Sequence, residues 1–115
     1  EDVSLALRSQ LEWFGCEVAQ AGSAQSAKAR VAEHHFDLLL LDVELPDGHG
    51  PDLANALRAS EPKVQDTRIA IVSGHQAPSV LPPGVDEWLT KPVVLERMNM
   101  LLAAARHHVA IAHAA

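Results

Sequence analysis

Residues 38–50 of the chain read Leu38-Leu39-Leu40-Leu41-Asp42-Val43-Glu44-Leu45-Pro46-Asp47-Gly48-His49-Gly50. Four apolar residues run directly into a carboxylate, and a segment rich in proline and glycine follows. A continuous apolar run bounded by turn residues predicts a strand buried on both faces, as in a parallel α/β sheet. Asp42 would then lie at the carboxyl end of that strand, where open α/β sheets carry their chemistry. A metal ligand, a nucleophile and a simple cap of the following loop remain alternatives for this carboxylate.

The composition indicates one globular domain. The chain has 115 residues, of which 48% are hydrophobic, enough for a packed core. Its net charge is −6 and its nine Lys and Arg residues are scattered, so we expect no nucleic-acid binding by this chain. The single cysteine, Cys16, predicts a buried thiol in a reducing, cytoplasmic setting. No apolar run approaches the ~20 residues that span a bilayer, so we expect no membrane contact.

Helical and strand patterns alternate along the chain. Apolar spacing predicts a first helix over 5–14 that Gly15 ends, and Ser23 is a candidate N-cap for the next helix. Strands separated by helices favour a parallel sheet that is covered on both faces. The full set of expected elements is helix 5–14, strand 17–20, helix 23–34, strand 37–42, helix 51–60, strand 68–73, strand 86–91 and a last helix from 93 or 94 to 106.

Polar residues of three different kinds stand at the ends of three expected strands: Asp42, Ser73 and Lys91. A carboxylate that attacks phosphorus, a hydroxyl that bonds a phosphoryl oxygen and an ammonium that neutralises charge together suit phosphoryl transfer. Such a site needs Mg²⁺, which prefers oxygen ligands, and Glu1 and Asp2 offer two more carboxylates. The plainer interpretations are a solvated chain start for Glu1-Asp2 and a surface lysine for Lys91.

Several short motifs follow one another along the chain. They are Glu1-Asp2, Leu7-Arg8, Leu11-Glu12-x-x-Gly15-x-x-Val18-x-x-Ala21, Phe36-Asp37-Leu38-Leu39-Leu40-Leu41-Asp42-x-x-Leu45-Pro46-Asp47-x-x-Gly50, Ser73-Gly74 and Gly84-Val85-Asp86-Glu87-Trp88-Leu89-Thr90-Lys91-Pro92. With these motifs in this order, the chain resembles the receiver domain of two-component response regulators and hybrid sensor kinases, and the resemblance covers nearly the whole chain.

The resemblance implies a phosphoacceptor role for Asp42, which would take a phosphoryl group from a histidine of a partner kinase or phosphotransfer domain. Glu1 and Asp2 resemble the acidic pair that holds Mg²⁺ together with Asp42. Glu44 occupies the position whose backbone carbonyl also binds the metal. The domain would promote its own phosphorylation and dephosphorylation, and we expect no stand-alone turnover.

The same resemblance assigns the remaining site positions. Ser73 matches the hydroxyl residue that reorients toward the phosphoryl group, and Lys91 matches the lysine that pairs with Asp42. Pro92 matches the cis-bonded proline after that lysine. Trp88 stands at the position of the family's aromatic switch, where Tyr or Phe is more usual.

The implied fold is a flavodoxin-like, doubly wound parallel sheet of order 2-1-3-4-5, from which this chain departs in two ways. The family's first strand should directly precede Glu1-Asp2, and the chain lacks it, so we expect an N-terminally truncated receiver domain over 1–106. The segment between Ser73 and Lys91 is short and holds Pro78, Pro82 and Pro83, so the fourth helix should be shortened or absent. Residues 107–115 have the composition of a C-terminal tail or linker.

Three functions are compatible with these features. The first is a phosphoacceptor module of a phosphorelay, either a single-domain regulator or the cytoplasmic part of a membrane-anchored hybrid kinase. The second is a protein-interaction module with the same fold that phosphorylation does not switch. The third, a phosphatase with an aspartate nucleophile, fits poorly because Glu44 stands where such enzymes carry an aspartate and no room is left for a cap domain. An exposed sheet edge left by the missing strand also leaves self-association open.

Overall fold

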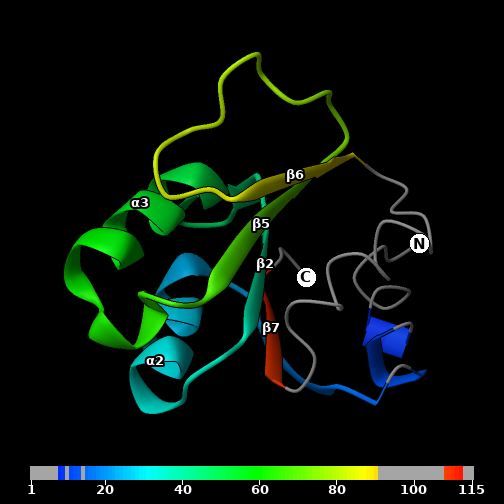
Figure 1. Ribbon diagram of the computed structural model, residues 1–115, viewed down its shortest axis with the longest axis vertical. Helices are drawn as coiled ribbons and strands as arrows, with labels where there is room; N and C mark the ends of the chain where they lie inside the picture. The colour runs from blue at the N-terminus through cyan, green and yellow to red at the C-terminus, as the bar shows by residue number, and fades with distance from the viewer. Residues whose placement is uncertain (1–7, 10, 14, 91–107, 113–115) are drawn as a thin grey trace.

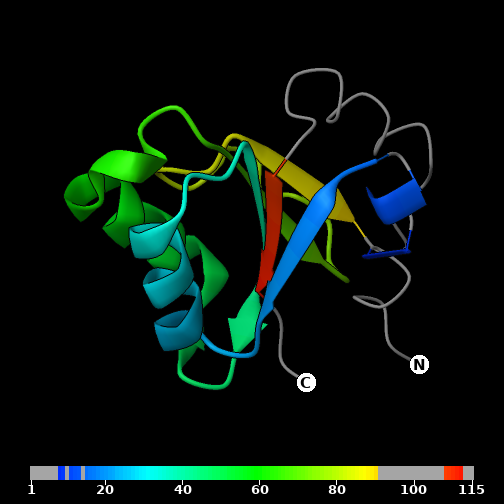
Figure 2. The same cartoon turned by 90° about the horizontal axis from the view of Figure 1, so that it is seen from below.

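The protein forms a five-stranded parallel sheet with helices on both faces (Figures 1 and 2). The computed structural model describes residues 8–9, 11–13 and 15–90, together with the backbone of 108–112. The strand order is β1-β7-β2-β5-β6. These strands are β1 (Glu17–Ala21), β2 (Leu38–Asp42), β5 (Arg68–Ser73), β6 (Glu87–Thr90) and β7 (His108–Ala112), and a small antiparallel pair is formed by β3 (Glu44–Leu45) and β4 (Gly48–His49).

The helices form where capping residues and turns delimit them. Helix α2 (Ala24–Glu33) begins after Ser23, whose Oγ accepts a hydrogen bond from the Ser26 backbone N–H at 3.1 Å, as predicted for an N-cap. Helix α3 (Gly50–Ser60) carries Pro51 in its first turn, where the missing N–H costs nothing. A 3₁₀ turn, η1 (Pro62–Val64), follows α3.

The two faces of the sheet are covered by different segments. Figure 2 shows α2 and α3 on one side and the helical residues 8–9 and 11–13 on the other. Gly15 ends that first helical stretch with a φ of 90°, a conformation that glycine adopts without strain. Cys16, which follows, is buried as a free thiol.

The core is built around the apolar run that the sequence predicted to be a strand. Leu38 to Leu41 have no exposed surface, and Ile69 to Ile71 of the neighbouring β5 are equally buried. Because both faces of β2 are covered, its residues need not alternate between apolar and polar types. The fold class and the buried strand are therefore confirmed.

The interior position next to β2 is occupied by β7, which comes from the C-terminal end of the chain. Its backbone pairs in parallel with β1, where Glu17 lies opposite His108, and with β2, where Leu38 lies opposite Val109. The expectation of a tail or linker after residue 106 is wrong for 108–112. The physical reason is that the backbones of β1 and β2 need hydrogen-bond partners on the edges that face each other, and β7 supplies both.

Residues 74–86 form an exposed loop between β5 and β6, which arches over the end of the sheet in Figure 1. The loop contains no helix, so the prediction of a shortened or absent fourth helix is confirmed. The helix expected from 93 or 94 to 106 lies outside the described residues. Within the described part, no helix has the length and apolar character needed to cross a bilayer.

Candidate functional site

The carboxyl ends of β2 and β5 bring Asp42 and Ser73 to the same edge of the sheet. Asp42 lies opposite Val72 in the parallel register, one residue before Ser73, and Ser73 lies opposite Thr90. Asp42 is half-buried, and Ser73 is buried. Lys91 directly follows Thr90 in sequence, but Lys91, Pro92, Glu1 and Asp2 all lie outside the described residues.

The loop after Asp42 turns sharply back over the strand end. The Val43 backbone N–H donates to the Val72 carbonyl at 3.2 Å, and the Gly50 N–H donates to the Val43 carbonyl at 2.7 Å. A Cβ atom on Gly50 would overlap the Asp42 carbonyl oxygen and also crowd Ile71. Glycine at position 50 therefore permits the start of α3 to approach the backbone of the candidate nucleophile.

Asp47 ties the same loop to the N-terminus of α2. Its carboxylate accepts hydrogen bonds from the backbone N–H groups of Ala24, at 2.7 Å, and Gln25, at 3.1 Å. These two bonds lower the pKa of the Asp47 carboxyl from its ordinary value of 3.8. The negative charge also lies at the positive end of the helix dipole. The segment that follows Asp42 is thus fixed to α2, the helix that precedes β2 in sequence.

A two-residue turn after β5 links Ser73 to Trp88. The His75 backbone N–H donates to Ser73 Oγ at 2.9 Å, and the indole N–H of Trp88 donates to the His75 carbonyl at 3.1 Å. Trp88 is half-buried and packs against the core cluster. Ser73 and Trp88, the two switch positions that the resemblance implies, are therefore connected through the backbone of one residue, His75.

Three residues at this edge had no role in the sequence-based expectations: Gly50, Asp47 and His75. Gly50 and Asp47 belonged to the quoted motif, but the motif does not say which backbone each one contacts. His75 acts through its backbone, so its side-chain chemistry gives no signal. Glu44 lies in β3 and its side chain is exposed. Only its backbone is therefore expected to take part in the site at the end of β2.

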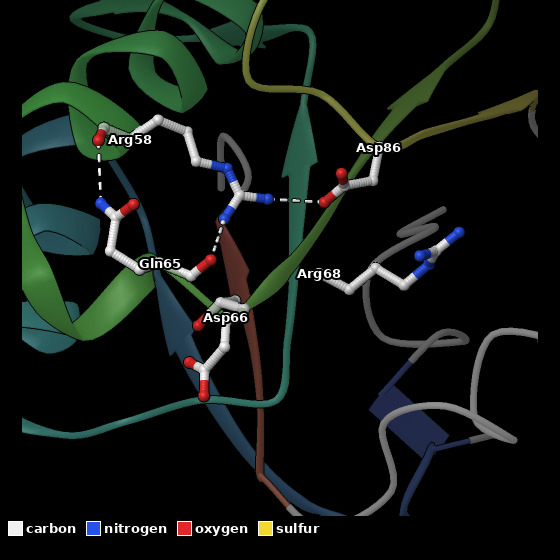
Figure 3. A pocket seen from close by; sticks show the side chains of 6 residues that line it. Arg58, Gln65, Asp66, Arg68 and Asp86 are labelled. Atoms are coloured by element: carbon white, nitrogen blue, oxygen red, sulfur yellow. Dashed lines mark hydrogen bonds and ion pairs between the residues drawn. The ribbon is translucent and has the colours of Figure 1, made fainter.

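A polar hollow, drawn in Figure 3, lies at the end of the sheet where β5 begins, away from Asp42 and Ser73. Arg58 of α3 donates to Asp86 at 2.6 Å and to the Val64 carbonyl at 2.6 Å, while Asp86 also accepts the Ile69 backbone N–H at 2.8 Å. The hollow measures about 360 Å³ and is lined by Arg58, Gln65, Asp66, Thr67, Arg68 and Asp86. Because its charged groups already pair with the protein, we assign it a structural role in holding the segments that lead into β5 and β6.

The donors available near Asp42 are of the type that Mg²⁺ binds. The Asp42 carboxylate and the carbonyls of the following loop are oxygen ligands, which suit a hard cation better than a thiolate or imidazole set would. In the part of the chain that the structure describes, no three His, Cys, Asp or Glu side chains gather closely enough to hold a metal ion. Any further carboxylates for the metal would have to come from outside that part, where Glu1 and Asp2 lie.

A family model for the response regulator receiver domain matches residues 1–103 of the chain. The chain belongs to this family. The receiver domain is also similar to parts of longer curated proteins, such as the virulence sensor protein BvgS of Bordetella bronchiseptica, 34% identical over 113 residues. It is 32% identical over 108 residues to the response regulator protein PilR of Pseudomonas aeruginosa. These alignments cover 89% and 90% of this chain but only 9% and 24% of the two relatives.

Solved structures agree with the receiver fold. A sensor protein from Polaromonas sp. JS666 has a TM-score of 0.76 and 29% identity, with 90% of this chain and 86% of that chain covered. The response regulator TrrA of Thermotoga maritima, solved in complex with Mg²⁺ and BeF, has a TM-score of 0.74 and 22% identity, with coverage of 85% and 84%. At that identity the second likeness supports the fold alone, and the bound Mg²⁺ is a property of that protein.

Proposed function

We propose that this receiver domain accepts a phosphoryl group on Asp42 from a phosphorylated histidine of a partner kinase or phosphotransfer domain, in a Mg²⁺-dependent reaction in the cytoplasm. The observation that carries the proposal is the position of Asp42 at the end of a fully buried strand, one register position from Ser73. Rigid elements thus present a carboxylate and a hydroxyl at the same edge.

The chemistry is a direct transfer between two nucleophiles. One Asp42 carboxylate oxygen forms a bond to phosphorus while the bond between phosphorus and the histidine nitrogen breaks, and the electron pair of that bond stays on the imidazole. The product is an acyl phosphate, which water later hydrolyses. A bound Mg²⁺ would neutralise charge on the phosphoryl oxygens. The ligands of this ion would be Asp42, the backbone carbonyl of Glu44, Glu1 and Asp2.

The other side chains have distinct proposed roles. The Ser73 hydroxyl donates a hydrogen bond to a phosphoryl oxygen, and Lys91 pairs first with Asp42 and then with the phosphoryl group. Pro92 fixes the backbone that follows Lys91. Trp88 responds to the state of the site because it is joined to Ser73 through His75.

The proposal is tested by phosphorylation with a small-molecule donor. Phosphoramidate contains the same phosphorus–nitrogen bond as phosphohistidine, and with Mg²⁺ it should add one phosphoryl group per chain, seen as one adduct by intact-mass spectrometry. The adduct should be lost in Asp42→Asn and on addition of a chelator. Asp52→Asn, a matched change in the exposed first turn of α3, should retain it.

Two outcomes would contradict the proposal. An adduct that survives Asp42→Asn would place the acceptor elsewhere. A folded wild-type chain that forms no adduct would instead favour the interaction module that phosphorylation does not switch. The exposed loop 74–86, which replaces a helix, is the feature that keeps this second function under consideration.

A further inference from the structure

We propose that a second hollow, at the amino end of the sheet, binds a small aromatic carboxylate through Arg30. The hollow lies where β1 begins, where α2 ends and where the chain leads into β2, and it measures about 370 Å³. That volume is within the range of sites that bind small molecules, about 300–1,000 Å³. Asp42 and Ser73 lie at the carboxyl end of the same sheet, so this hollow is separate from the proposed phosphoacceptor site.

Part of the lining of this hollow is apolar and aromatic. Val18 and Ala19 of β1 are half-buried there, and Phe36 is buried beside them. The exposed ring of His34 meets the Phe36 ring edge to face, with 6.5 Å between the ring centroids and 75° between the planes. The two rings form one aromatic wall, against which a flat ring would bury apolar area and make a further aromatic contact.

Arg30 supplies a positive charge that the protein itself does not use. It lies in the last turn of α2 and lines the hollow, and its side chain forms no hydrogen bond or ion pair in the described part of the chain. The other three arginines of that part, at positions 8, 58 and 68, each pair with a carboxylate. A guanidinium presents two parallel N–H donors that match the two oxygens of a carboxylate. Arg30 is therefore the group that would hold the charged end of a ligand.

The remaining charged groups around the hollow limit how much negative charge the ligand can carry. Glu17 is exposed and lines the hollow, so it repels a doubly charged phosphate more strongly than a carboxylate with a single charge. His35 also lines the hollow, but its Nε2 is already bound to the Asp66 carboxylate at 2.9 Å. One unpaired cation beside an aromatic wall thus favours an aromatic ligand with one carboxylate.

The test is a titration of the full chain with 2-naphthoate, a flat fused ring that carries one carboxylate, followed by amide NMR spectra. The amide signals of Val18, Ala19 and Phe36 should shift in a saturable manner, and those of Asp42 and Ser73 should not. Naphthalene-2-carboxamide has the same shape without the charge and should bind about tenfold more weakly or worse, because the charged hydrogen bonds are lost. Inorganic phosphate should leave these signals unchanged.

Substitutions at exposed positions separate the two halves of the site without disturbing the core. Arg30→Gln should weaken 2-naphthoate binding about tenfold or more. Lys28→Gln is the matched control, since it removes the same charge from an exposed position of α2 that does not line the hollow. His34→Ala should weaken binding about two- to tenfold by removing one ring of the wall, and it keeps the backbone N–H that donates to the Arg30 carbonyl at the end of α2.

Four outcomes would overturn the proposal. If 2-naphthoate shifts no signals, or only signals away from the hollow, there is no such site. Equal binding of 2-naphthoate by wild type and Arg30→Gln, or of the carboxamide and the carboxylate by wild type, would remove the role of the charge. Equal weakening in Lys28→Gln would mean that only the overall charge of α2 matters. Phosphate that shifts the same signals would make the hollow a site for inorganic anions. None of these results depends on phosphorylation of Asp42, so the proposed function stands or fails separately.

Discussion

Gly50, the first residue of α3, lies so close to the Asp42 carbonyl oxygen that no larger residue fits without a shift of the backbone. The contact joins the helix after the candidate nucleophile to the strand that carries it. It also explains why a glycine occupies a helix start, where alanine would otherwise give a more stable helix.

Gly50→Ala should lower the free energy of unfolding by about 1–3 kcal/mol, because the added methyl group overpacks the region between Asp42 and Ile71. The measurement is urea unfolding followed by circular dichroism. Gly48→Ala is the matched control, since a Cβ atom at Gly48 meets nothing within 4 Å. Equal stability of the two variants would mean that the close approach is absent in solution.

His49→Asn should stabilise the protein by about 0.5–2 kcal/mol. His49 is the N-cap residue of α3 and its side chain makes no capping hydrogen bond, whereas asparagine is among the best N-cap residues. Asparagine is preferred to aspartate for this test because it adds no charge near Asp42. Thermal unfolding of His49→Asn and of the control His49→Ala should show a gain for the first variant alone.

Asp47→Asn should destabilise the protein in a pH-dependent manner. Hydrogen bonds from Ala24 and Gln25 lower the pKa of the folded-state carboxyl below its ordinary value of 3.8. The ionised form is thus favoured by folding, so its contribution is complete above the unfolded-state pKa and disappears as the pH falls through the folded-state pKa.

The stability difference between wild type and Asp47→Asn should therefore be larger at pH 7 than at pH 3, as measured by urea unfolding at both pH values. Asp52→Asn, which changes another exposed acidic residue, serves as the control for the effect of overall charge. A difference that stays constant between the two pH values would rule out the Asp47 carboxylate as its source.

Ala110→Pro should destabilise the protein by at least about 1–3 kcal/mol, because β7 lies between two strands and proline cannot donate to either. Thermal unfolding is the measurement. Ala77→Pro places the same substitution in the exposed loop between β5 and β6 and should have a small effect. If both variants unfold at the wild-type temperature, β7 does not occupy the interior of the sheet in solution.

The strands nearest the candidate site could be predicted from sequence because their signals are local. The run from Leu38 to Leu41 is apolar throughout and too short for a helix. In a chain whose helical and strand patterns alternate, such a run predicts a buried strand, and Ser73 ends a second run of the same kind. Parallel pairing of these two strands is then enough to predict that Asp42 and Ser73 lie at the same edge of the sheet. The Pro-rich composition of 74–86 likewise excluded a regular helix.

The origin of the interior strand could not be predicted in the same way. His108–Ala112 reads HVAIA, a histidine followed by four apolar residues, within an Ala- and His-rich segment that has the composition of a linker. What makes it a strand is the unsatisfied backbone of β1 and β2, a property of the assembled sheet and not of the segment. The link from Ser73 to Trp88 was missed for a related reason, since it passes through backbone atoms of His75.

The place of β7 has a consequence for how the chain can fold as it is synthesised. Glu17 and His108, which face each other in the sheet, are separated by most of the sequence. Closing such a long loop is slow and is rewarded only once the strand has docked. In the observed pairing, β1 joins the strands that hold Asp42 only through β7, so we expect the facing backbone edges of β1 and β2 to stay unpaired until residue 112 has left the ribosome. Unpaired strand edges promote aggregation, so this interval is the one in which the nascent chain is most exposed to it.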